Sequence, residues 1–321
     1  MVKTDKLSQN ANKVKAKTAF IKDWTRCIKR DYLLYLLLVP FILYYVIFVF
    51  KPMYGLQIAF KDYSLFKGIQ NSPWVGFKHF IDFFTGTYFL TNLKNTVLIS
   101  LLNIVVGFPM PIILALLFNE VKSKKFKAIG QTVTYLPHFI SAVVVAGIVT
   151  NILSPESGLI NGIIKLFKGE PIYFLTKPEY FRTIFTSMSV WKEAGFGSII
   201  YTAALAAIDA QLYEAAYIDG ASKWKQLIHI TIPSILPTLS IMLILRIGRL
   251  LEVGYETIIL LYQPATYKTA DVISTYVFRS GIIDGNYSLA SAAGLFNSAV
   301  ALVLVISSNT ISKKLSENGL W

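Results

Sequence analysis

The segment EAAYIDG, residues 214–220, is followed nine residues later by ITIP, residues 230–233, and the whole stretch lies between two long apolar runs. Because a polar segment between membrane-crossing runs must return to water, we expect this stretch at a membrane surface. Its pattern predicts a short helix that ends at Gly220, a second helix, and Pro233 before the next apolar run. Such a compact element offers a surface to a partner protein.

The composition indicates a membrane protein. Of the 321 residues, 54% are hydrophobic and only 15% are charged, whereas soluble domains carry about 25% charged residues. Several apolar runs reach the roughly 20 residues that a helix needs to cross a bilayer. Because a backbone inside lipid must satisfy its own hydrogen bonds, these runs are expected to be helices.

We therefore predict an all-α membrane protein with six transmembrane helices. Their expected bounds are Tyr32–Phe50, Thr96–Phe118, Thr132–Ile152, Thr183–Ala207, Ile235–Val253 and Leu289–Ser308. A basic N-terminal arm is expected at residues 1–31, the six-helix domain at 32–309, and a C-terminal tail at 310–321. The polar segment described above lies within a loop at 208–234, called here the 208–234 loop.

Basic residues set the expected orientation. The formal net charge of +13 is compatible with nucleic-acid binding, but basic residues that flank membrane helices face the cytoplasm, and this explanation is the simpler one. Residues 1–31 hold nine Lys or Arg residues, and Lys223, Lys225, Lys313 and Lys314 lie on the same predicted side. We expect a multi-pass protein of the cell membrane with both termini and the 208–234 loop in the cytoplasm. The single cysteine, Cys27, permits no internal disulfide.

Local signals define the 208–234 loop further. Asp209 is suited to cap a helix over Gln211–Asp219, and Gly220 can adopt the left-handed conformation that ends a helix tightly. A second helix is expected to begin near Ser222. Glu214 supplies a negative charge on the first helix.

This stretch resembles the signature of permease subunits of bacterial ABC importers. The signature reads Glu-Ala-Ala, three residues, Gly, nine residues, then Ile-x-Leu-Pro; six of its seven fixed positions match, and Ile232 replaces the Leu. Further segments are similar to the oligosaccharide branch, which includes the maltose-transporter permeases of the first carbohydrate-uptake family. They are residues 135–141, 219–222, 270–276, 294–298 and 316–321.

The resemblance implies a type I importer permease whose loop is the coupling helix that sits in a cleft of a separate ATPase. The residues that it assigns to coupling are Glu214, Ala215, Ala216, Asp219, Gly220, Ile230 and Pro233. The implied partners are a second homologous permease subunit, a dimer of ATP-binding subunits, an extracytoplasmic sugar-binding protein and membrane lipid, with no nucleic acid. The sequence has no Gly-x4-Gly-Lys-Ser/Thr phosphate loop. We therefore expect no enzyme activity and no cofactor on this chain, with ATP and Mg used by the partner ATPase.

Charged residues within the predicted spans are candidates for the pathway or for a subunit interface. Arg246, Arg249 and Glu252 are three residues apart in the fifth span, so they share one helical face, and Arg249 and Glu252 are placed to pair. Intramembrane charge indicates either a pathway lining or a structural ion pair between permeases. Further candidates are Trp191, Glu193 and Asn297. Trp191 suits stacking on a sugar, although packing is the commoner role of a buried aromatic ring. His138, next to Pro137, is expected at a helix start.

The predicted function is a permease subunit of an ATP-driven, binding-protein-dependent sugar importer, with an oligosaccharide as the expected substrate. Two alternatives stay open. An ion-coupled secondary transporter would need buried carboxylates for the coupling ion, and the spans offer Glu193 and Glu252. An ABC permease for a non-sugar solute is excluded only by the branch resemblance.

Overall fold

The computed structural model describes residues 29–251 and 253–316, and the chain divides into two compact units, one ending at Gln57 and one beginning at Ile58. Among the described residues every named element is a helix, and pairing between extended segments is limited to one isolated bridge between Lys61 and Trp74. The predicted all-α membrane class is confirmed. Of the predicted N-terminal arm, residues 1–28 lie outside the described part of the chain.

The first unit is formed by the first apolar run. It comprises α2 (Tyr32–Tyr45), the π-helix η1 (Val46–Phe50) and α3 (Lys51–Met53), and the 3-10 helix η2 (Tyr54–Phe60) continues past its end. Together these form 29 continuous helical residues, long and apolar enough to cross a membrane. The predicted span Tyr32–Phe50 is therefore helical and extends further, and Pro40 lies within it without ending it.

The second unit holds the remaining elements. In chain order they are α4 (Gly68–Asn71), α5 (Lys78–Thr85), α6 (Phe89–Val105), α7 (Pro109–Glu120), α8 (Lys124–Tyr135), η3 (Leu136–Phe139), α9 (Ala142–Leu153), α10 (Leu159–Leu166), η4 (Phe174–Thr176), α11 (Pro178–Ala206), α12 (Ala210–Ile218), α13 (Lys223–Gln226), η5 (Leu227–Thr231), α14 (Ile232–Gly248), α15 (Tyr255–Leu261), η6 (Pro264–Thr266), α16 (Tyr267–Ala270), α17 (Ile273–Phe278), η7 (Arg279–Ile283) and α18 (Tyr287–Ser316).

The described residues contain four helices long and apolar enough to span a membrane, or up to six if each of two bent pairs is one span. The predicted third span, Thr132–Ile152, belongs to such a pair: α8 and η3 meet α9 at an angle of 104°. Pro137 is the second residue of the 3-10 helix η3, and Ser141 then caps a new helix by accepting a hydrogen bond from the Val144 N–H at 3.4 Å. The predicted third span is therefore bent within its bounds and is not one continuous helix.

The fifth predicted span, Ile235–Val253, is displaced toward the 208–234 loop. The helix runs without a break from Lys223 through α13, η5 and α14 to Gly248, a 26-residue segment called here the 223–248 rod. At its end the rod packs closely against α18, since a Cβ on Gly248 would lie 2.5 Å from Cγ2 of Val305 in α18. The second helix of the loop and the fifth span are thus one element.

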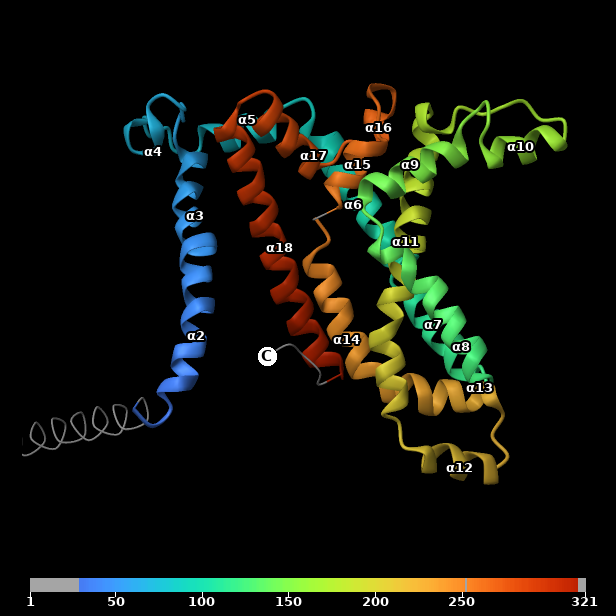
Figure 1. Ribbon diagram of the computed structural model, residues 1–321. Coiled ribbons are helices and arrows are strands. Elements are labelled where there is room, and N and C mark those ends of the chain that lie inside the picture. The colour runs from blue at the N-terminus through green and yellow to red at the C-terminus, as the bar shows by residue number, and fades with distance from the viewer. Residues whose placement is uncertain (1–28, 252, 317–321) are drawn as a thin grey trace, which may run out of the picture. The chain divides into compact units, whose positions relative to one another are not determined.

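The long helix α11 is the centre of packing in the second unit, with α7 and α8 against it, while α14 and α18 lie side by side (Figure 1). Gly195 permits the contact with α8, because a Cβ there would lie 1.9 Å from the carbonyl oxygen of Thr134. Buried side chains of α6, α9 and α11 form one core around Ile99, Val145 and Phe185. A second core lies around Tyr201 and Ile235.

The two ends of the second unit differ in their elements. Figure 1 shows α12 and α13 at one end and α10, α16 and α17 at the other. Helix α18 contains the predicted span Leu289–Ser308 and continues to Ser316, so residues 310–316 of the predicted tail extend this helix. Residues 317–321 lie outside the described part of the chain.

Candidate functional site

The 208–234 loop begins with the helix and glycine turn that the sequence predicts. The Asp209 Oδ1 accepts a hydrogen bond from the Gln211 N–H at 2.9 Å, which caps α12. Gly220 has a φ of 74°, and the Ala221 N–H donates to the Ala216 carbonyl oxygen at 2.8 Å. This is the left-handed helix ending that glycine favours, so α12 stops at a defined residue.

Internal polar contacts hold α12 against the start of the 223–248 rod. The Tyr213 hydroxyl and the Thr231 Oγ1 lie 2.9 Å apart, and the buried Gln226 donates from Nε2 to the Ala221 carbonyl oxygen at 3.1 Å. Ser222 caps α13 by accepting from the Lys225 N–H. The sequence analysis did not single out Tyr213, Thr231 or Gln226. Polar side chains on the inward side of an amphipathic loop helix are a signal that could have identified them. The loop is therefore an internally tied unit.

The outer side of α12 is exposed and partly apolar. Tyr217 is 80% exposed and Ile218 is 83% exposed, and Glu214 and Ala215 are exposed beside them. Exposed aromatic and aliphatic side chains next to a charge are typical of a protein-docking surface. Of the other residues that the sequence assigns to coupling, Ile230 and Pro233 lie on the 223–248 rod.

A partly open cavity of about 600 Å³, called here the central cavity, is lined by α6, α9, α11, α15 and the end of α14. It brings together three of the predicted pathway residues, Glu193 from α11 with Arg246 and Arg249 from the fifth span. Lys192 lines it as well. A volume of roughly 300–1,000 Å³ is usual for small-molecule sites.

Two of these charges have defined partners. The Arg246 Nη2 donates to the Asn103 carbonyl oxygen at 2.9 Å. The Glu193 Oε2 lies 2.9 Å from the His138 Nδ1, and the His138 ring stacks on Phe196 with centroids 4.0 Å apart. His138 was expected simply to begin a helix; it lies inside η3, and its side chain instead joins the bend of the third span to α11.

The remaining predicted residues lie elsewhere. Trp191 lines a separate apolar groove with Ile148 and Ile160 and is 47% exposed, so its role stays a prediction. Asn297 on α18 donates to the Leu251 carbonyl oxygen at 3.4 Å. Glu252 lies outside the described residues, so its expected pairing with Arg249 stays a prediction.

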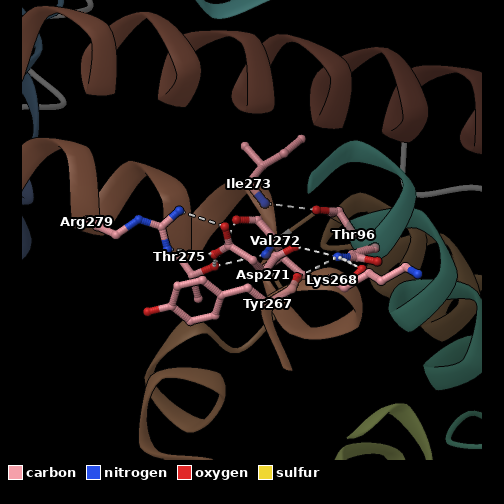
Figure 2. Close-up of polar contacts among 9 residues, drawn as sticks. Thr96, Tyr267, Lys268, Asp271, Val272, Ile273, Thr275 and Arg279 are labelled. Atoms are coloured by element: carbon pink, nitrogen blue, oxygen red, sulfur yellow. Dashed lines mark hydrogen bonds and ion pairs between the residues drawn. The ribbon is translucent and has the colours of Figure 1, made fainter. Parts of the chain in front are cut away.

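A polar cluster at the opposite end from α12 was not expected (Figure 2). Helix α17 spans Ile273–Phe278, and the Asp271 carboxylate just before it accepts from the Thr275 hydroxyl at 2.7 Å and from the Arg279 guanidinium. An aspartate followed eight residues later by an arginine, with a threonine between them, is the sequence signal for this pairing.

The Asp271–Arg279 pair is bidentate, with distances of 3.1 and 2.7 Å, and its side chains are only 3% and 20% exposed. The hydrogen bonds that the Arg279 guanidinium donates to Asp271 raise the pKa of Arg279 above its usual value. Asn95 of α6 ties this cluster to the helix bundle, since its Nδ2 donates to the Asp271 carbonyl oxygen at 2.9 Å and its Oδ1 accepts from Arg182 at 2.8 Å. The cluster thus fixes the loop before α17 to α6 and α11.

Comparison with known proteins gives a consistent set of relatives. Residues 107–317 match the family described as "Binding-protein-dependent transport system inner membrane component". Protein LplB of Bacillus subtilis (strain 168) is 43% identical over 298 residues, which cover 93% of this chain and 94% of that protein. The polygalacturonan/rhamnogalacturonan transport system permease protein YteP of the same organism is 44% identical over 296 residues, 92% of each chain.

A solved structure is also similar. It is a chain from a bacterial alginate ABC transporter in complex with an alginate pentasaccharide-bound periplasmic protein. The TM-score is 0.86 and the sequence identity 49%, covering 92% of this chain and 99% of that chain. The likeness therefore extends over nearly the whole fold.

Proposed function

Because the chain belongs to the family of binding-protein-dependent transport system inner membrane components, we propose that it forms half of the translocation pathway of an ATP-driven oligosaccharide importer. A second homologous permease subunit supplies the other half. A dimer of ATP-binding subunits uses ATP and Mg on the cytoplasmic side, and an extracytoplasmic binding protein delivers the sugar. The names of YteP and of the alginate transporter support a saccharide substrate.

The observation that carries this proposal is the continuity between the 208–234 loop and the central cavity. The exposed face of α12 supplies the docking surface, with Glu214 as its polar contact and Ala215 and Ala216 allowing close approach. Contacts from Tyr213 and Gln226 tie this face to the 223–248 rod. The same rod carries Arg246 into the central cavity.

This connection between α12 and the central cavity explains how ATP hydrolysis on another subunit could move the helices that surround the sugar. Closure of the ATP-binding subunits moves α12, and a tied, unbroken helix transmits that displacement rather than absorbing it. The wall of the central cavity formed by the end of α14 then shifts against α11. Alternating access follows if the two positions of this wall open the pathway to opposite sides. The proposed location is the cell membrane, with both termini in the cytoplasm.

Reconstituted transport tests the proposal. The chain, its partner permease and the ATP-binding subunits are purified together and placed in liposomes with the binding protein and a labelled oligosaccharide. We expect uptake to require ATP on the side of the liposome membrane that α12 faces. Uptake should persist when an uncoupler removes the ion gradients. Uptake that needs no ATP and collapses with the uncoupler would favour an ion-coupled carrier instead.

A further inference from the structure

An apolar groove lies at the end of the second unit that carries α12. It has a volume of about 460 Å³, and we call it the α7–α13 groove because the last turns of α7 and the start of the 223–248 rod line it. Its apolar lining includes Ile113, Leu116 and Leu117 of α7 and Leu227 of the rod. One stretch long enough to span a membrane ends here at Glu120, and another begins here at Lys223. The groove therefore lies where both spans reach the membrane surface.

A polar contact joins the two spans at this level. The Lys223 Nζ lies 3.4 Å from the Glu120 Oε2. Trp224 also lines the groove and is 69% exposed. Tryptophan is enriched where lipid meets water, because its ring has a large apolar body and one N–H donor. Ile113 precedes Glu120 by about 10 Å along the helix, so the groove runs from this polar end into the apolar span.

Positive charge is concentrated around the polar end of the groove. Residues 120–127 and 222–229 contain six lysines and one acidic residue, Glu120, so the carboxylate balances only one of the six positive charges. Lys122 and Lys124 are exposed at the turn from α7 to α8, and Lys225 is exposed beside Trp224. This excess of positive charge favours an occupant with a negatively charged end.

A phospholipid with a negatively charged headgroup combines an apolar chain with an anionic end, and basic pockets between membrane helices on the cytoplasmic side suit such headgroups. We propose that the α7–α13 groove binds an anionic phospholipid of the cytoplasmic leaflet, with an acyl chain along Ile113 and Leu117 and the phosphate at Lys223 and Trp224. A zwitterionic lipid offers the same chain without the net charge, so it binds less tightly. The proposal takes from the proposed function only the orientation that places α12 in the cytoplasm.

The groove also reaches the contacts that tie α12 to the 223–248 rod. Tyr213, Gln226 and Thr231 line it, and these residues form the hydrogen bonds that hold α12 in place. A bound acyl chain therefore packs beside the connection through which α12 moves the rod. Because a ligand that binds the folded assembly stabilises it, the lipid should raise the unfolding temperature of the assembly.

Lipid binding to the purified assembly tests this site. The chain, its partner permease and the ATP-binding subunits are titrated in detergent with phosphatidylglycerol, or with phosphatidylcholine that carries the same acyl chains, and bound lipid is counted by native mass spectrometry. We expect phosphatidylglycerol to bind at least about fivefold more tightly, the factor that one lysine near an anionic headgroup provides. Added salt should reduce this preference, because ions screen the attraction between the lysines and the headgroup.

Two variants separate the headgroup contact from the acyl-chain contact. Lys223→Gln should lower the affinity for phosphatidylglycerol about fivefold and leave the affinity for phosphatidylcholine nearly unchanged. Leu117→Trp places a larger side chain in the groove and should weaken the binding of both lipids.

Each variant has a matched control. Lys78→Gln removes an exposed lysine of α5, at the opposite end from α12 (Figure 1). Leu302→Trp makes the same change as Leu117→Trp on α18, at a residue that does not line the groove; Leu302 is 61% exposed and Leu117 is 59% exposed. Neither control should change either affinity. Thermal unfolding identifies a variant that fails to fold, and if Leu117→Trp does not assemble, the exposed Lys223→Gln decides the outcome.

Equal affinities for the two lipids would overturn the proposal, as would an unchanged preference for phosphatidylglycerol in Lys223→Gln or an equal loss in Lys78→Gln. Absence of lipid binding because another subunit occupies the groove would overturn it as well. ATP-driven uptake that continues in these cases leaves the proposed function intact. Absence of ATP-driven uptake in liposomes of either lipid would instead contradict the proposed function itself.

Discussion

Replacing Glu214 by lysine is expected to abolish ATP-driven uptake while leaving the assembly in the membrane. Glu214 is exposed on α12 and forms no salt bridge within the described residues, so the folded chain tolerates the change. At the proposed interface the reversal places a like charge where an opposite charge is required. Loss of a buried interfacial charge contact costs about 2–5 kcal/mol, or roughly 30-fold or more in affinity. The readout is uptake in liposomes together with the amount of ATP-binding subunit that co-purifies.

A second variant and a control complete this test. In Gly220→Pro the ring fixes φ near −65°, whereas Gly220 has a φ of 74°, and the N–H that donates to the Tyr217 carbonyl oxygen at 3.1 Å is lost. The glycine turn is disrupted, and uptake should fall to background. Glu170→Lys makes the same charge reversal at an exposed residue between α10 and η4 and should leave uptake unchanged. Normal uptake by both loop variants would exclude α12 as the coupling element.

Replacing Asp271 by alanine is expected to lower the stability of the chain strongly. The carboxylate is 3% exposed, and its loss leaves the Arg279 guanidinium without its bidentate partner. Breaking one side of a buried ion pair costs about 3–5 kcal/mol. Arg279→Ala should cost a similar amount, and the double variant should cost less than the sum of the two single changes. Thermal or denaturant unfolding in detergent measures all three.

The chain offers a matched comparison for this pair. Glu120 and Lys223 are 3.4 Å apart with side chains 63% and 80% exposed, so Glu120→Ala should change stability by less than about 1 kcal/mol. Because the pKa of Arg279 is raised in the folded state, this arginine adds stability that is fully present below its pKa in the unfolded state. That stability is lost only as the pH rises through its pKa in the folded state. That window lies far above neutrality, so Arg279 should give no pH dependence near pH 7. Equal costs for Asp271→Ala and Glu120→Ala would show that burial does not strengthen the Asp271–Arg279 pair.

Local signals predicted the parts of the molecule that short-range chemistry determines. The cap at Asp209, the left-handed Gly220 and the helix start after Ser222 each depend on a few neighbouring residues, and each is found where expected. The span cores at Tyr32–Phe50 and Leu289–Ser308 were predictable because lipid demands long apolar helices. Glu193 and Arg246 were recognisable as candidate functional residues because charged side chains are rare inside long apolar spans.

Features that depend on distant residues were not predictable in this way. The bend of the third span needs Pro137 and a cap at Ser141 to act together, and hydropathy is insensitive to both. The continuity of the 223–248 rod across Pro233 contradicts the expectation that proline separates the loop from the span. Pro233 lies just after the junction of the π-helix η5 with α14, and the backbone stays helical there. The contact of Asn95 with the backbone of Asp271 joins residues 176 positions apart, and no spacing rule reveals it.

Crosslinking from the tip of α12 tests the proposed coupling most directly. A photoreactive benzoylphenylalanine replaces Tyr217, which is 80% exposed, or Phe66, which is fully exposed in the loop between η2 and α4, in the tagged full chain. Cells are irradiated, and the crosslinked partners are identified by mass spectrometry. We predict an ATP-binding subunit crosslinked from position 217 and none from position 66. Absence of an ATP-binding subunit at position 217, or its equal capture from both positions, would contradict the assignment of α12 as the coupling surface.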